Sequence, residues 1–154
     1  MAGVCLKRSV HIVLGVGSSL LIGVFTSLTY SFILIISGVL GSLFPDLDLR
    51  YRHRILLHNI LMLIVSSMLT GFLLLYLGFS RIFSAYFSAG FFMGYMSHLI
   101  GDMLTYRGVA LLYPFLRKMF KIPIGSSEST LVNLLGYLVG ILFIAIYIFS
   151  KIRP

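Results

Sequence analysis

Seven polar side chains stand out in this apolar chain as candidates for metal chemistry. They comprise all four histidines and three of the four acids, namely His11, Asp46, Asp48, His53, His58, His98 and Asp102. His98 and Asp102 are four residues apart, so on a helix they share one face with Cβ atoms about 5–6 Å apart. Asp46 and Asp48 form an Asp-x-Asp turn after Pro45, and a bend there can direct both carboxylates inward.

The mixture of side chains indicates which metals would fit. Imidazole and carboxylate together suit zinc, manganese or iron(II), whereas calcium and magnesium prefer all-oxygen shells. A zinc ion takes three or four protein ligands, so seven candidates exceed the needs of one ion. The surplus indicates two metals about 3.5–4 Å apart, with a bridging water or hydroxide as nucleophile.

Each of these residues also has a structural explanation. Polar groups at helix ends can lie in the headgroup region, where they cost little. The two aspartates after Pro45 can pair with the arginines that follow them, and Asp102 can pair with Arg107. A structural explanation must account for seven residues separately, however, so their convergence favours a metal site.

The composition places these residues in an integral membrane protein. The chain has 154 residues, of which 59% are hydrophobic and 10% charged, with a mean hydropathy of +1.06. Soluble domains are about 45–50% apolar and about 25% charged, so a soluble globule is excluded, and disorder requires low hydrophobicity. We expect one domain over residues 1–154. The net charge of +8 indicates loops that face anionic lipids, and direct nucleic-acid binding is not expected.

Five apolar segments predict an all-α bundle of about five transmembrane helices. They cover about residues 10–28, 31–44, 56–79, 82–104 and 131–150. A spanning helix needs about 20 residues, and four segments meet that length. The second is short, which suggests a thin, tilted or partly re-entrant helix, and Pro45 should end it because proline cannot extend the hydrogen-bond ladder. Recurrent glycines predict close helix packing.

The distribution of lysine and arginine predicts the orientation. With five spans and a cytoplasmic amino terminus, nine basic residues fall inside and three outside. The inner set is Lys7, Arg8, Arg50, Arg52, Arg54, Arg107, Arg117, Lys118 and Lys121, and the outer set is Arg81, Lys151 and Arg153. The positive-inside rule therefore favours a multi-pass protein of the cell membrane, with the seven candidate ligands at its cytoplasmic face. A re-entrant second segment would move every later loop to the other side.

The order and spacing of several short motifs resemble the YdjM-like family. The motifs are His11, Pro45-Asp46-Leu47-Asp48, His53-Arg54-x-x-x-His58, Ser97-His98-Leu99-x-x-Asp102-x-x-Thr105 and Gly108-Val109-x-x-Leu112-Tyr113-Pro114. That family is described as inner-membrane, LexA-binding, metal-dependent hydrolases, and it is distantly similar to zinc-dependent phospholipases C. The resemblance runs from His11 to Pro114 and implies metal-ligand or catalytic roles for the seven residues above.

This chain departs from the family pattern around its second histidine motif. The family usually has His-Arg-Gly-x-Thr-His-Ser, whereas here Ile55, Leu57 and Asn59 replace the Gly, Thr and Ser. Any hydroxyl contribution from that turn is therefore lost, although Asn59 could orient a ligand by hydrogen bonding. Nothing in the sequence indicates a surface for LexA.

We therefore expect a membrane-bound metal-dependent hydrolase, similar to a phospholipase or phosphoesterase. Metal-activated water would attack a phosphoester of a lipid or another membrane-borne substrate, with one to three divalent ions, zinc first and manganese or iron next. Asp48 or Asp102 would act as general base, and Arg54 would neutralise a phosphate oxygen. Membrane lipids are the expected partners, with a phospholipid as candidate substrate. The alternatives are a non-catalytic metal-binding or transport protein and a structural or regulatory membrane protein whose polar residues tie loops together.

Overall fold

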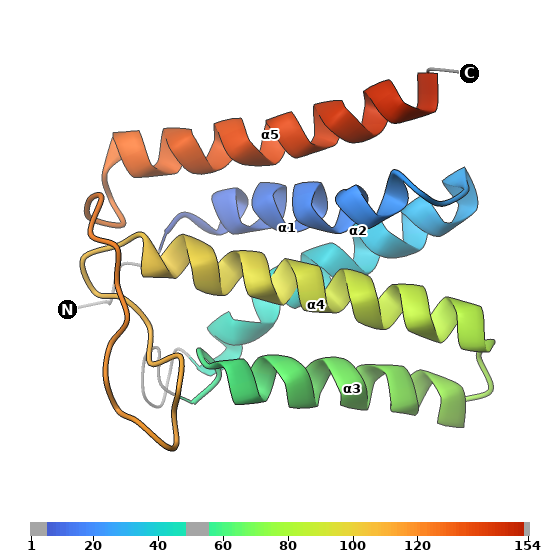
Figure 1. Ribbon diagram of the computed structural model, residues 1–154, viewed down its shortest axis with the longest axis horizontal. Helices are drawn as coiled ribbons and strands as arrows, with labels where there is room; N and C mark the ends of the chain where they lie inside the picture. Colours follow the sequence, from blue (N-terminus) through green and yellow to red (C-terminus); the bar gives the residue numbers. More distant parts are fainter. Residues whose placement is uncertain (1–5, 49–55, 153–154) are drawn as a thin grey trace.

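The computed structural model describes residues 6–48 and 56–152 and consists of five α-helices (Figure 1). They are α1 (Arg8–Gly23), α2 (Leu28–Leu43), α3 (Ile60–Tyr76), α4 (Arg81–Met103) and α5 (Thr130–Ile152), and a 3-10 helix, η1 (Phe44–Asp48), follows α2. The five predicted segments each contain one helix. Pro45 lies in η1, so α2 ends two residues before the proline, in agreement with the predicted stop.

Helix α4 lies at the centre of the bundle. It packs against α1, α2 and α3, while α5 packs against α1 on the side away from α3 (Figure 1). The start of α1, η1, the starts of α3 and α5, and the end of α4 all lie at one end of the bundle, which we call the cluster end. The long connection between α4 and α5 also lies there and bonds to α3, because Ile60 N–H donates to Leu111 O over 3.0 Å.

Length and hydropathy together support two of the five expected spans. In the described residues, two helical stretches are long and apolar enough to cross a membrane, Leu28–Leu47 and Thr130–Ile152. The second segment, expected to be short, therefore qualifies, because η1 continues α2 to 20 residues. The segments expected over 10–28 and 56–79 form helices of only 16 and 17 residues. The all-helical fold is thus observed, and the five-span topology stays a prediction.

The bundle places apolar side chains outside and polar ones inside. Phe72 of α3 and Leu138 of α5 are 63% and 54% exposed, while Ser19, Ser37 and Ser42 are buried. The buried serines donate to carbonyls of their own helices, for example Ser37 Oγ to Ile33 O at 2.8 Å. This arrangement suits hydrocarbon solvent, where backbone and side-chain polar groups must be satisfied inside the protein.

Three helices approach closely at glycines. Gly38 of α2 faces Gly15 of α1 and Gly94 of α4: a Cβ added at Gly38 would lie 2.8 Å from Gly15 O, and one added at Gly94 would lie 2.9 Å from the carbonyl carbon of Gly38. Any larger side chain would separate the helices. Membrane helices use small residues in this way because close backbone approach increases van der Waals contact.

Candidate metal centre

The glycine contact determines where the polar side chains meet. One helical turn separates Gly15 from His11, Gly38 from Ser42 and Gly94 from His98. Because residues four apart lie one above the other on a helix, the three helices that converge at Gly38 bring His11, Ser42 and His98 together toward the cluster end. Asp102 follows one turn further along α4.

His98 is held in one orientation by a backbone carbonyl. Its Nδ1 lies 2.7 Å from Ser42 O, and because a carbonyl can only accept, Nδ1 carries the proton in this contact. In the neutral imidazole, Nε2 then bears the lone pair. Metal-binding histidines commonly donate their other ring nitrogen to a carbonyl in this manner, which fixes the tautomer and the ring.

The lone pair of His98 faces three further ligand atoms. Its Nε2 lies 3.3 Å from His58 Nε2, 3.7 Å from Asp46 Oδ1 and 3.7 Å from Asp102 Oδ2. His58 Nε2 and Asp102 Oδ2 are 3.5 Å apart. Two ligands of a tetrahedral zinc ion, each about 2.0–2.2 Å from the metal, are about 3.3–3.6 Å apart. The Nε2 atoms of His58 and His98 and Oδ2 of Asp102 therefore have nearly the mutual spacing of ligands of one tetrahedral ion, and Asp46 Oδ1 is the candidate fourth ligand.

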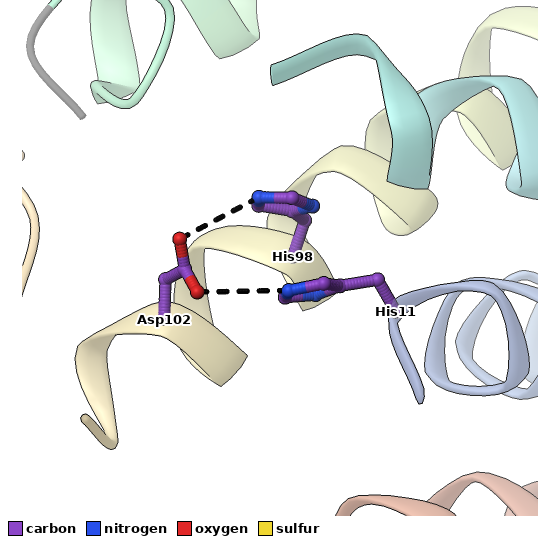
Figure 2. Close-up of side chains that lie close together, drawn as sticks. All are labelled: His11, His98 and Asp102. Atoms are coloured by element: carbon purple, nitrogen blue, oxygen red, sulfur yellow. Dashed lines mark ion pairs between the residues drawn. The ribbon is translucent and has the colours of Figure 1, made fainter. Parts of the chain in front are cut away.

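His11 extends the cluster on the other side of His98. The two rings are stacked with centroids 3.8 Å apart, and His11 Nε2 lies 3.6 Å from Asp102 Oδ1 (Figure 2). Asp102 thus directs one oxygen toward His11 and the other toward His98 (Figure 2). The second oxygen also faces His58. A carboxylate with this placement can bridge two ions, whereas His98 has one lone pair and can bind only one.

Burying these polar side chains together costs free energy unless they share a bound cation. The side chains of His11, His58, His98 and Asp102 are fully buried, and Asp46 is 8% exposed. Among the described residues, both ring nitrogens of His11, Nδ1 of His58 and Oδ1 of Asp46 have no hydrogen-bond partner. Buried polar atoms are normally paired, and acceptors gathered 3.3–3.7 Å apart are what a metal ion would join. The donor set therefore fits a divalent metal.

Five of the seven sequence-predicted ligands meet in this cluster: His11, Asp46, His58, His98 and Asp102. The backbone of Asp48 lies in η1, next to Asp46 in the same 3-10 helix, but its side chain lies outside the described part of the structure. His53 and Arg54 also fall outside the described residues. Arg107, the alternative partner for Asp102, is exposed, and Asp102 instead makes ion-pair contacts with three histidines.

Two supporting residues, Ser42 and Tyr95, were not recognised in the sequence as parts of the site, whereas Asn59 was singled out there as a residue that could orient a ligand. Ser42 contributes a backbone carbonyl, which no sequence pattern marks. Tyr95, one turn before Leu99 on α4, donates its hydroxyl to Leu57 O next to His58. Asn59 caps α3 through Oδ1, which accepts from Met62 N–H at 2.8 Å, and its amide donates to Leu56 O at 2.6 Å. The Asn-x-x pattern before an apolar run is the one signal that could have indicated this cap.

The fold and the cluster together define an all-helical membrane protein with a buried His/Asp centre at one end of its bundle. The chain belongs to the YdjM inner membrane protein family, whose model matches residues 6–153. No curated protein and no solved structure shows significant similarity to it. The family match agrees with the resemblance seen in the motifs and places the protein in the inner membrane, while its orientation there stays a prediction.

Proposed function

We propose that this chain is a membrane-bound, metal-dependent hydrolase that cleaves a phosphoester of a membrane-borne substrate. One observation carries the proposal: the Nε2 atoms of His58 and His98 and Oδ2 of Asp102 lie 3.3–3.7 Å from one another, close to the spacing of ligands of one tetrahedral ion, and Asp46 Oδ1 lies 3.7 Å from His98 Nε2. These four would hold the first ion, with zinc the best match for two imidazoles and two carboxylates. His11 Nε2 and Asp102 Oδ1 would begin a second site, to which Asp48 and His53 are the candidate additions.

The chemistry that bound divalent ions supply is Lewis acidity toward a phosphoryl group and activation of a water molecule as nucleophile. In the reaction, the water oxygen forms a bond to phosphorus, the ester P–O bond breaks, and the released alcohol takes a proton. We assign acceptance of the water proton to Asp48 or Asp102, one of which would act as general base in place of a ligand role. We assign Arg54 to a phosphate oxygen, where a guanidinium can form a bidentate pair.

The surroundings favour a substrate that is anchored in the membrane. Six exposed basic residues of the described chain lie at the start of α1 or in the connection between α4 and α5. They are Lys7, Arg8, Arg107, Arg117, Lys118 and Lys121. Anionic headgroups accumulate near such residues. The outer faces of α3 and α5 are apolar, and we place the cluster end at the depth where a lipid phosphate meets its hydrocarbon chains.

The proposed reaction is tested on purified, zinc-loaded protein in vesicles of phosphatidylethanolamine and phosphatidylglycerol. We expect phosphorus NMR to detect a phosphomonoester released by the wild type, with release abolished in Asp102→Asn. Thr70→Ala is the matched control, because Thr70 lies in α3 and its hydroxyl donates within that helix to Ser66 O, over 2.7 Å. Absence of hydrolysis by metal-loaded protein toward both lipids and soluble phosphodiesters would contradict the proposal.

Complete burial of the ligands supports a second candidate, a non-catalytic metal centre. Structural zinc sites are closed by four protein ligands, whereas catalytic sites keep an open position, and the set of His58, His98, Asp46 and Asp102 is already four. In this case the ion would fasten η1 and the residues before α3 to α4. A metal-loaded protein that loses thermal stability with its metal, yet hydrolyses no phosphoester, would favour this candidate.

A further inference from the structure

A second feature, an apolar cavity, lies beside the polar cluster. It lies between α1, α4 and α5 and has a volume of about 370 Å³. This volume is within the range of about 300–1,000 Å³ that ligand sites occupy. Its walls include Leu14 of α1, Met93 and Leu104 of α4, and Val139 and Phe143 of α5.

The shape of the cavity follows the bundle axis. Along α4 and its C-cap the lining extends from Met93 to Leu104, eleven residue steps that span about 16 Å at the helical rise of 1.5 Å per residue. Hydrocarbon chains of a bilayer extend in the direction of the transmembrane helices, so the long dimension suits a single extended chain. The cavity also reaches the surface, because Ile100 and Val139 in its lining are 47% and 40% exposed.

The lining chemistry favours hydrocarbon. The two hydroxyl groups among its lining residues belong to Ser18 and Ser97. Ser18 Oγ donates to Gly15 O and Met93 O, over 3.1 and 3.2 Å, and Ser97 Oγ donates to Gly94 O over 2.8 Å. With these donors already bonded to backbone carbonyls, the cavity suits an occupant that needs no hydrogen bonds.

The cavity ends against the candidate metal centre. Gly101 lines it and immediately precedes Asp102, and a Cβ added at Gly101 would lie 3.4 Å from Cε1 of His11. A single glycine therefore separates the cavity from the His11 ring. The exposed basic residues near the cluster end, Lys7, Arg8 and Arg107 among them, complement an anionic phosphate there, while the hydrocarbon chain extends away from the cluster.

We propose that this cavity binds an acyl chain of a phospholipid, whose phosphate it presents to the cluster end. That the bound lipid is a substrate rests on the proposed function. The inference then specifies the substrate class as a lipid with a hydrocarbon chain. A soluble phosphoester would lack the chain and therefore the interaction with α1, α4 and α5.

The test is photocrosslinking of the intact protein in phosphatidylethanolamine–phosphatidylglycerol vesicles that contain phosphatidylglycerol with a diazirine in mid-chain. We expect mass spectrometry to place adducts on lining residues, Met93 and Phe143 among them. Val139→Phe should lower these adducts about tenfold, because an extra ring overfills the site. Leu138→Phe, the adjacent residue outside the lining and 54% exposed, should leave the yield unchanged.

Equal yields in the two variants, or adducts spread evenly over lipid-facing residues such as Leu134 and Leu138, would overturn the acyl-chain assignment. A shift of oligomeric state in Val139→Phe with unchanged adducts would also overturn it and assign the cavity to a second copy of the chain. The His98→Ala variant separates this inference from the proposed function. Adducts on the lining should persist in that variant, so crosslinking can succeed even where every hydrolysis assay fails.

Discussion

His58 and His98 are 40 residues apart in the chain, yet their Nε2 atoms face each other across 3.3 Å in the interior of the bundle. Ser42 O holds the proton of His98 on Nδ1, so a neutral His98 directs a lone pair at His58 and at the carboxylates of Asp46 and Asp102. Lone pairs and carboxylates repel each other unless a proton or a cation lies between them. This relationship is the physical basis for inferring a metal in the cluster.

Replacing His11 and replacing His98 should have different effects on the metal content of the protein. His98→Ala removes the ligand that faces His58, Asp46 and Asp102, whereas His11→Ala leaves these groups in place. We therefore expect His11→Ala to retain about one ion per chain and His98→Ala to retain much less, because the three remaining groups lose the histidine that each of them faces. Elemental analysis measures both, and equal loss in the two variants would exclude separate sites.

Asn59 should couple the stability of α3 to the cluster, because it caps the helix directly after His58. Asn59→Ala should lower the free energy of unfolding by about 1 kcal/mol, a typical cost for a lost N-cap. It should also weaken zinc binding at least several-fold, because His58 loses its fixed position, and Asn59→Asp should restore the cap. Thermal unfolding in detergent and competition with a zinc chelator measure the two effects.

Ser80 provides the matched control for this prediction. Its Oγ caps α4 by accepting from Phe83 N–H at 3.2 Å, at the end of α4 away from His98 and Asp102. Ser80→Ala should lower stability by a similar amount while leaving zinc affinity unchanged. A fall in zinc affinity for Ser80→Ala equal to that of Asn59→Ala would show that helix capping acts only through global stability.

Gly94→Ala should disrupt the cluster without touching any ligand. The new Cβ would lie 2.9 Å from the carbonyl carbon of Gly38, so α2 and α4 must separate, and Ser42 O would move away from His98. We expect a loss of about 1–3 kcal/mol in stability from overpacking, together with reduced metal content. At Gly71, by contrast, an added Cβ would meet the side chain of Ser88 at the longer distance of 3.3 Å. Gly71→Ala should keep the metal, and full metal in Gly94→Ala would refute the role of the glycine contact.

The cluster end should face the cytoplasm. A membrane-impermeant maleimide should label Cys5, the single cysteine of the sequence, only after the membrane of spheroplasts is permeabilised. With Cys5 replaced by serine, a cysteine at Phe25, which lies between α1 and α2 and is 90% exposed, should react in intact spheroplasts. The reverse pattern would place the cluster at the periplasmic face.

Much of the fold was accessible from hydropathy alone. Each of the five apolar segments contains one helix, and α4 ends at Met103, one residue from the expected limit. The lengths of α1 and α3 were overestimated, because apolar residues such as Leu56 and Phe79 continue beyond the helices into connections. The end of α2 near Pro45 was predicted correctly, although the 3-10 helix η1 continues in helical form past the proline.

The candidate site was accessible in part because helix spacing relates residues that are close in sequence. The interval of four between His98 and Asp102 predicts their common face, and the topology places His11, Asp46 and His58 at the same end. The contact between Gly38 and Gly94 was not predictable, since it depends on how α2 and α4 cross. The Ser42 carbonyl was missed for the same reason. The ligand roles of Asp48 and His53 and the phosphate-binding role of Arg54 stay predictions.

The most direct test of the metal centre is elemental analysis of the detergent-purified wild type beside a variant that combines His98→Ala and Asp102→Ala. We expect at least one zinc, manganese or iron per wild-type chain and essentially none in the variant, with far-ultraviolet circular dichroism showing that both retain their helices. A wild type that contains no transition metal, even after incubation with zinc at neutral pH, would contradict the metal centre and leave the cluster as a network that fastens α1, α3 and α4 together.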